Sequence, residues 1–154
     1  LEIHDDRGEP HWARQRDAKV LIFGGPDEME LCSTLSDEIN HKGGTDRATH
    51  FCGQLSLLET AAAMQYCDVI VTNDTGLMHI ATAMHRKVVA IFGSTVMEFG
   101  FFPYDKQAKV LEQVGLYCRP CSHIGRSDCP EKHFRCMTET RADEVYETVR
   151  AIAN

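Results

Sequence analysis

The chain has 154 residues, of which 43% are hydrophobic and 25% are charged, and its formal net charge is -7. This length fits one ordinary domain with a core of its own. The acidic balance argues against broad nucleic-acid binding, which usually leaves a basic surface. No apolar run has the length of a membrane span, and no signal-peptide pattern opens the chain. The first residue is Leu1 and not an initiator Met. We therefore expect a segment of a longer protein without a transmembrane helix.

The first part of the chain predicts an arm followed by a strand and a helix. Residues 1–18 are polar and charged, with Trp12 as their one large anchor, so we expect a polar arm or the remnant of a truncated first element. Lys19 and the apolar run 20–23 predict a strand that ends in two glycines. Pro26, with acidic residues after it, predicts the start of a helix that runs to about His41.

The rest of the chain alternates between strands and helices. Strands are predicted over 48–52, 69–72 and 87–92, with an edge strand over 109–114. Helices are predicted over 57–66 and 77–84, and a final helix follows the last strand. The helix over 57–66 has a capping box at Ser56 and Glu59, and the final helix starts at a capping box over 140–143. Such alternation indicates βαβ units and a parallel sheet with helices on both faces. The predicted fold class is therefore α/β, in one domain over 19–154 that includes an irregular cysteine-bearing loop at 115–137.

Polar, glycine-bearing turns follow four of the predicted strands. They lie at 24–25, 53, 74–76 and 93–95. Ligands of parallel sheets bind outside the carboxyl ends of the strands. We therefore expect these four turns along one edge of the sheet, where they favour a binding site.

The turn that follows the strand at 69–72 carries the strongest signal. It leads through Gly76 into a helix, so backbone N–H groups and the positive helix end meet at one point, which favours phosphate or another anion. Asp74, Thr75 and His79 add an acceptor, a hydroxyl group and an imidazole. The alternative is a capped turn, with Asp74 as the N-cap and His79 as an ordinary half-buried histidine. The pattern leaves both interpretations open.

Glu28 follows the first predicted strand, where the dinucleotide fingerprint G-x-G-x-x-G is absent. Its carboxylate has two possible roles. It can hold the hydroxyl groups of a ribose through paired hydrogen bonds, or it can stabilise the helix dipole as an acid in the first turn.

The seven cysteines fall into two groups. Cys32, Cys52 and Cys67 are scattered among apolar residues, as expected of buried reduced thiols in a reducing cytosol. The other four form the series C-x2-C-x7-C-x6-C and are Cys118, Cys121, Cys129 and Cys136. The leading C-x-x-C favours a structural zinc site, with His123 and His133 as substitute ligands. Two disulfides or four packed thiols are the alternatives.

Two adjoining motifs carry a family resemblance. The sequence N-D-T-G-L-M-H-I-A-T-A at 73–83, followed by K-V-V-A-I-F-G-S-T at 87–95, resembles the bacterial heptosyltransferases of glycosyltransferase family nine. The segments F-G-G-P-D-E at 23–28 and G-Q-L-S-L at 53–57 are similar to the same family, as is the late cysteine series. The resemblance covers about residues 19–153, in the expected order.

The resemblance implies the donor-binding half of an inverting GT-B glycosyltransferase, built on a Rossmann-like parallel sheet. It implies transfer of heptose from ADP-heptose to the lipopolysaccharide inner core, in the cytoplasm or peripherally at the inner membrane, with no cofactor required for catalysis. The lipid A–core acceptor and the general base are expected on a missing N-terminal domain. We therefore expect this segment alone to be inactive.

The resemblance also implies roles for individual residues. Thr75, Gly76 and Leu77 would meet the diphosphate, with Asp74 at the sugar hydroxyls and His79 at the phosphate–sugar end. Glu28 would hold the adenosine ribose. The full set of expected donor-binding residues is Glu28, Leu55 (by the adenine), Asp74, Thr75, Gly76, Leu77, His79, Gly93 and Ser94.

Two other functions are left open. One is a nucleotide-sugar epimerase of the GT-B fold, which would need acidic and glycine-rich donor motifs that the sequence lacks after residue 96. The other is a non-enzymatic, zinc-bearing interaction domain organised by residues 118–136. A metal assay beside a nucleotide titration would separate the second from the enzymes.

Overall fold

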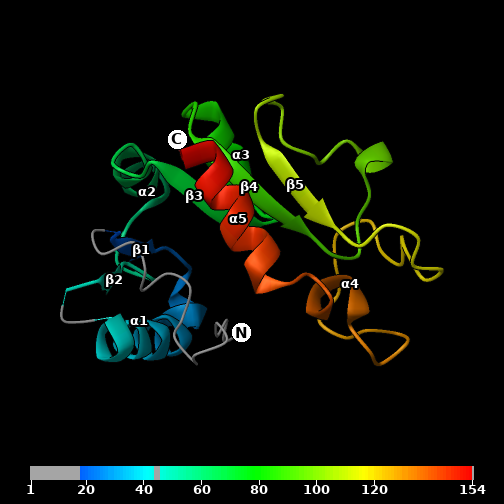
Figure 1. Ribbon diagram of the computed structural model, residues 1–154, viewed down its shortest axis with the longest axis horizontal. Helices are drawn as coiled ribbons and strands as arrows, with labels where there is room; N and C mark the ends of the chain where they lie inside the picture. The colour runs from blue at the N-terminus through cyan, green and yellow to red at the C-terminus, as the bar shows by residue number, and fades with distance from the viewer. Residues whose placement is uncertain (1–17, 44–45, 154) are drawn as a thin grey trace. The chain divides into compact units, whose positions relative to one another are not determined.

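A computed structural model describes residues 18–43 and 46–153 (Figure 1). The predicted polar arm with Trp12 lies outside these residues except for Ala18. The chain forms two compact units, Leu1–Cys67 and Asp68–Asn154. Each unit has a parallel sheet of its own.

The first unit is built around a two-stranded sheet. β1 (Val20–Ile22) pairs in parallel with β2 (Ala48–His50). Between them lie the 3-10 helix η2 (Pro26–Glu28) and the helix α1 (Met29–Gly43), and α2 (Leu57–Met64) follows β2. Asn40 near the end of α1 fixes the start of β2. Its side chain accepts from the N–H of Ala48 at 2.8 Å and donates to the C=O of the same residue at 2.9 Å.

The start of α2 is the predicted capping box. The N–H of Ser56 donates to the Glu59 carboxylate at 2.8 Å, and the N–H of Glu59 donates to the Ser56 hydroxyl at 3.4 Å. Two N–H groups that a helix end leaves without partners are satisfied in this way. The sequence prediction is confirmed here.

The first unit also holds a disulfide between Cys32 and Cys52. The expectation of reduced thiols at these two positions is therefore wrong. Cys32 lies on α1 and Cys52 follows β2, and α1 packs against β2, so the two Cα atoms are 6.4 Å apart. This separation lies within the range that a disulfide can bridge. The pairing depends on tertiary packing, which the spacing of the cysteines does not show.

The second unit is a three-stranded parallel sheet with helices packed on it (Figure 1). Its strands are β3 (Val69–Asn73), β4 (Lys87–Phe92) and β5 (Lys109–Glu112), with β4 in the middle. The helices α3 (Gly76–Ala83) and α5 (Ala142–Ala153) both contact β3 and β4. Successive strand residues point to opposite faces of a sheet. Since Val88, Val89 and Ala90 are all fully buried, both faces of β4 are covered. The predicted α/β fold with parallel strands is confirmed.

Two short elements complete the second unit. They are η3 (Met97–Phe99) and α4 (Arg135–Thr138). The cysteine-bearing loop, expected to be irregular over 115–137, thus ends in the short helix α4. β5 ends at Glu112, two residues before the predicted limit of 114. The C=O of the next residue, Gln113, accepts a hydrogen bond from Nη1 of Arg119 rather than from a neighbouring strand. Of the helices described, none combines the length and the apolar character needed to cross a membrane.

The capping box gives a stability prediction. Replacing Ser56 with Ala should lower the free energy of unfolding by about 1 kcal/mol, because the N-cap acceptor for the N–H of Glu59 is lost. Urea unfolding followed by circular dichroism measures the change. Ser56→Thr keeps a hydroxyl acceptor and should stay close to the unsubstituted protein. An equal loss in both variants would show that the cap does not stabilise α2.

Candidate functional site

The carboxyl ends of β3 and β4 bring two of the predicted turns together. The strands pair in register, with Asn73 opposite Ile91, so the turns at 74–76 and 93–95 leave the sheet side by side. The hydroxyl of Thr95 donates to Oδ2 of Asp74 at 2.7 Å and joins the two turns. A cavity of about 250 Å³ lies at this point.

The cavity is lined from two sides. The strand ends contribute Asn73, Asp74, Gly93, Ser94 and Thr95. The other walls come from side chains within 121–137 and Ile91. The predicted residues Asp74, Gly93 and Ser94 therefore share one cavity with part of the cysteine-bearing loop.

Gly93 contributes to this cavity through close packing. A Cβ atom built on Gly93 would lie 2.7 Å from Sδ of Met137, far inside normal contact. Met137 belongs to α4, which contacts β4. The absence of a side chain at Gly93 thus lets α4 approach the end of the strand. The glycine, which the sequence analysis expected to bind the donor, therefore also has a role in packing.

The predicted anion site is the start of α3. Thr75 is the N-cap residue, in an extended conformation, and its side chain makes no capping hydrogen bond. The alternative that made Asp74 the N-cap is wrong, because its carboxylate accepts from Thr95 instead. The N–H groups in the first turn of a helix have no acceptor within the helix. Thr75 and Gly76 are exposed, and nothing outside the chain neighbours and the backbone of α3 lies within 4 Å of a Cβ built on Gly76, so the space beside the helix start is open.

Leu77 and His79 continue the same helix. Both are half-buried, and His79 is the fourth residue of α3. Side chains on a helix lean toward its N-terminus and lie above residues three or four positions earlier. Helix geometry thus places His79 on the same face of α3 as Thr75 and Gly76.

The other two predicted residues belong to the first unit. Oε2 of Glu28 accepts from the N–H of Gly25 at 2.8 Å and so caps η2, while the side chain itself is exposed. Leu55 is half-buried just before α2. The N–H of Gly53 donates to the C=O of Gly24 at 3.0 Å, so the turns after β1 and β2 meet at one edge of their sheet.

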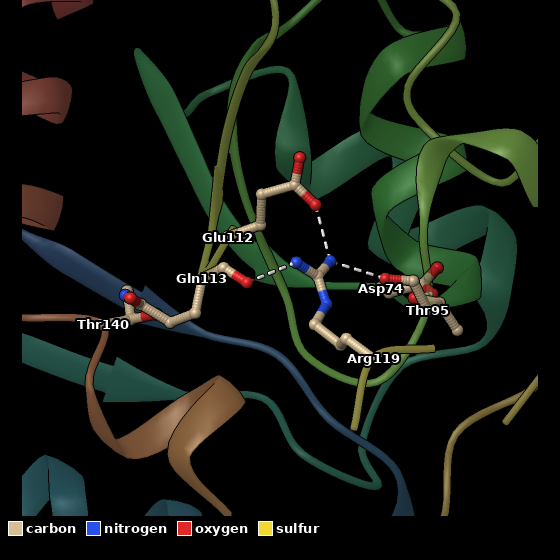
Figure 2. Close-up of polar contacts among 6 residues, drawn as sticks. All are labelled: Asp74, Thr95, Glu112, Gln113, Arg119 and Thr140. Carbon is tan, nitrogen blue, oxygen red and sulfur yellow. Dashed lines mark hydrogen bonds and ion pairs between the residues drawn. The ribbon is translucent and has the colours of Figure 1, made fainter. Parts of the chain in front are cut away.

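Sequence analysis missed Arg119, whose guanidinium makes three hydrogen bonds beside the site (Figure 2). Nη2 donates to the C=O of Thr95 at 2.6 Å and pairs with Oε2 of Glu112 at 2.5 Å, and Nη1 donates to the C=O of Gln113 at 2.8 Å. The side chain is only 6% exposed. The motif Cys-Arg-Pro-Cys marks the position, but nothing in the sequence points to Thr95 as its partner.

The four clustered cysteines line a second cavity, of about 330 Å³, together with His133. Sγ of Cys118 lies 3.9 Å from Nε2 of His133. His123, the other substitute ligand, packs its ring against Phe99. Over residues 18–43 and 46–153, no group of three or more His, Cys, Asp or Glu side chains is arranged to hold a metal ion. Zinc binding therefore stays a prediction.

Two of these thiols differ in acidity. Backbone N–H groups, that of Phe134 foremost, bond to the sulfur of Cys129 and lower its pKa. Burial raises the pKa of Cys136, and the neighbouring cysteines add to the effect. The thiolate of Cys129 therefore forms at lower pH than that of Cys136.

This difference predicts an order of alkylation in protein freed of metal by a chelator. At neutral pH, iodoacetamide should modify Cys129 before Cys136, because the thiolate is the reactive form and Cys136 is also buried. Mass spectrometry of peptides taken at timed intervals measures both rates. Faster modification of Cys136 would contradict the structure.

Zinc binding has its own test. If the four cysteines hold zinc as thiolates, elemental analysis should find about one zinc per chain, and chelation should loosen 115–137 in hydrogen exchange while sparing the sheet. Cys118→Ser should lose the metal, whereas the matched control Cys67→Ser, outside the cluster, should keep it. Metal-free protein in which all four thiols react readily would rule zinc out.

The chain is similar to proteins of one known family. The sequence model of glycosyltransferase family 9 (heptosyltransferase) matches residues 11–133. Lipooligosaccharide heptosyltransferase 2 of Campylobacter jejuni serotype O:6 is 31% identical over 136 residues, which cover 88% of this chain and 41% of the relative. Lipopolysaccharide heptosyltransferase 2 of Escherichia coli is 25% identical over 87% of this chain and 37% of its own length. The chain thus spans about two fifths of these relatives.

Solved structures show the same fold. The crystal structure of a family 9 glycosyl transferase from Veillonella parvula matches with a TM-score of 0.73 at 24% identity, over 93% of this chain and 38% of that one. The structure of Escherichia coli ADP-heptose lps heptosyltransferase II matches with a TM-score of 0.70 at 22% identity, over 93% and 40%. The family model covers most of the sequence, and the solved structures share its arrangement of parallel strands and helices. The chain belongs to glycosyltransferase family 9.

Proposed function

We propose that this chain binds the sugar-nucleotide donor of an inverting heptosyltransferase, that the donor is ADP-heptose, and that the acceptor is the lipopolysaccharide inner core. Membership of family 9 supports the reaction type, and the similar curated proteins are named as heptosyltransferases. The name of one solved neighbour includes ADP-heptose. With this donor and acceptor the enzyme would work in the cytoplasm, at the inner membrane.

The open helix start at Thr75 and Gly76 is the observation that carries the proposal. A diphosphate needs hydrogen-bond donors and positive potential, and the chain as a whole is acidic. The first-turn N–H groups of α3 and the helix dipole supply both without a basic side chain. The open space above Gly76 lets phosphate oxygens come close to the backbone.

Each expected residue takes a role that suits its surroundings. Thr75, Gly76 and Leu77 bind the diphosphate through their amides. His79, on the same face of α3, lies by the phosphate next to the sugar. Asp74 accepts hydrogen bonds from sugar hydroxyls, since Thr95 occupies only one of its carboxylate oxygens.

Glu28 and Leu55, which belong to the first unit, contact the adenosine of the donor in the proposal. Oε2 of Glu28 accepts from the N–H of Gly25, and its exposed carboxylate has further acceptor capacity for the ribose hydroxyls. Leu55 offers an apolar contact to the adenine. Glu28 thus combines both of the roles that the sequence left open, as a cap and as a ligand.

The chemistry assigned to this chain is stabilisation of the leaving group. As the bond between the anomeric carbon and the phosphate oxygen breaks, negative charge gathers on the departing ADP. Amides that already point at the diphosphate stabilise this charge without having to reorganise. The imidazole of His79 adds a donor at the oxygen where the charge develops.

Gly76→Val tests the proposal. The substitution should abolish ADP binding measured by calorimetry, because the valine side chain fills the space through which phosphate reaches the backbone. The fold should tolerate it, since nothing outside the chain neighbours and the backbone of α3 lies within 4 Å of the added Cβ. The thermal midpoint should therefore change little.

Ala83→Val is the matched control, because it places the same side chain at an exposed position at the other end of α3. This variant should bind ADP like the unsubstituted chain. A chain that binds no ADP, or a Gly76→Val variant that binds it normally, would contradict the proposed function.

A further inference from the structure

The carboxylate of Asp74 is held in one orientation. Its Oδ2 accepts the hydroxyl hydrogen of Thr95 at 2.7 Å, and Thr95 is 3% exposed. Among the hydrogen bonds between described residues, none reaches Oδ1 of Asp74. Asp74 is half-buried and lines the cavity of about 250 Å³ beside Ser94. One oxygen is therefore tied to the protein while the other is left as an acceptor.

Arg119 fixes Thr95 in turn. Nη2 donates to the C=O of Thr95 at 2.6 Å, so the backbone that carries the Thr95 hydroxyl is clamped (Figure 2). The same guanidinium spans to the end of β5, where it pairs with Glu112 and bonds to the C=O of Gln113. These contacts tie the turn after β4 to the end of β5 and to the residue that follows it.

Arg119 itself is not placed to bind a ligand. Glu112 balances its charge, protein oxygens occupy both terminal nitrogens, and the side chain is 6% exposed. Its Nε is buried without a hydrogen-bond partner among the described residues. Leaving a buried donor unpaired costs free energy. The guanidinium keeps this orientation because Nη1 and Nη2 make their hydrogen bonds in it. Its hydrogen bond to the turn beside Asp74 is the one to the C=O of Thr95.

We propose that Thr95 and Arg119 are positioning residues, which orient the Asp74 carboxylate toward hydroxyl groups of the donor's sugar. The assignment rests on the proposed function and extends it to two residues outside the ligand-binding set. A carboxylate only accepts hydrogen bonds, and a hydroxyl donates one to it strongly. With Oδ2 held by Thr95, Oδ1 keeps a defined direction in the cavity and selects for a sugar that presents a hydroxyl there.

The position of the sugar provides a readout that a general loss of structure would not give. ADP has the diphosphate and the adenosine but no sugar beyond them. Binding of ADP therefore depends on the start of α3, whereas binding of ADP-heptose depends on Asp74 as well. A misdirected Asp74 should weaken ADP-heptose and spare ADP.

Thr95→Val is the decisive variant, since it removes the hydroxyl and keeps the shape of the side chain. Calorimetric titration should show that ADP-heptose binds about tenfold more weakly, which corresponds to a loss of ~1.4 kcal/mol in binding free energy. The affinity for ADP should stay within about twofold of its original value. Thr95→Ser, which keeps the hydroxyl, should restore ADP-heptose binding. Arg119→Lys, which keeps the charge but not the fork of donors, should show the same selective loss.

Two controls separate positioning from stability. Thr82→Val removes another buried hydroxyl of the same unit, one that donates to the C=O of Met78, and should alter neither affinity. In an Asp74→Asn background, Thr95→Val should weaken ADP-heptose by less than about twofold, because the two residues act as one unit.

The outcomes are distinguishable. Equal weakening of ADP and ADP-heptose in both Thr95→Val and Arg119→Lys would overturn the assignment and leave a structural role. Unchanged affinities in both variants would overturn it as well. An unsubstituted chain that binds neither ligand would overturn the proposed function, and the positioning role with it.

Discussion

The parallel pairing of β3 with β4 is the constraint on which the candidate site depends. Because Asn73 lies opposite Ile91, both strands end together and their turns leave the sheet at the same edge. The hydrogen bond between Thr95 and Asp74 then fixes one turn against the other. With Asp74 held in this way, Thr75 takes the N-cap position with an extended backbone and α3 begins in open space. The open start of α3 and the carboxylate beside it therefore follow from one strand register.

The cysteine-bearing loop supports this arrangement from the other side. Its residue Arg119, between two cysteines, binds the backbone of Thr95, and side chains within 121–137 close the cavity beside Asp74. Met137 of α4 packs where Gly93 leaves room. An irregular segment is thus part of the frame of the site, whether its four thiols hold a metal or not.

Local features were predictable from the sequence, and contacts between distant residues were not. Continuous apolar runs predicted β3 and β4, and the capping box at Ser56 needed only residues within one turn. The alternative that made Asp74 the N-cap is wrong because a hydroxyl 21 positions further along the chain donates to its carboxylate. The disulfide between Cys32 and Cys52 and the clamp by Arg119 likewise depend on how elements pack. Their sequence spacing has no pattern that would have predicted these contacts.

Donor binding at the start of α3 is the central claim, and amide NMR of the chain tests it most directly. Titration with ADP and, separately, with adenosine isolates the contribution of the diphosphate. We expect ADP to shift the amide signals of residues 75–77 strongly and adenosine to leave them almost unchanged, because these N–H groups face phosphate rather than the nucleoside. Equal shifts with both ligands, or ADP shifts confined to residues far from the start of α3, would contradict the account.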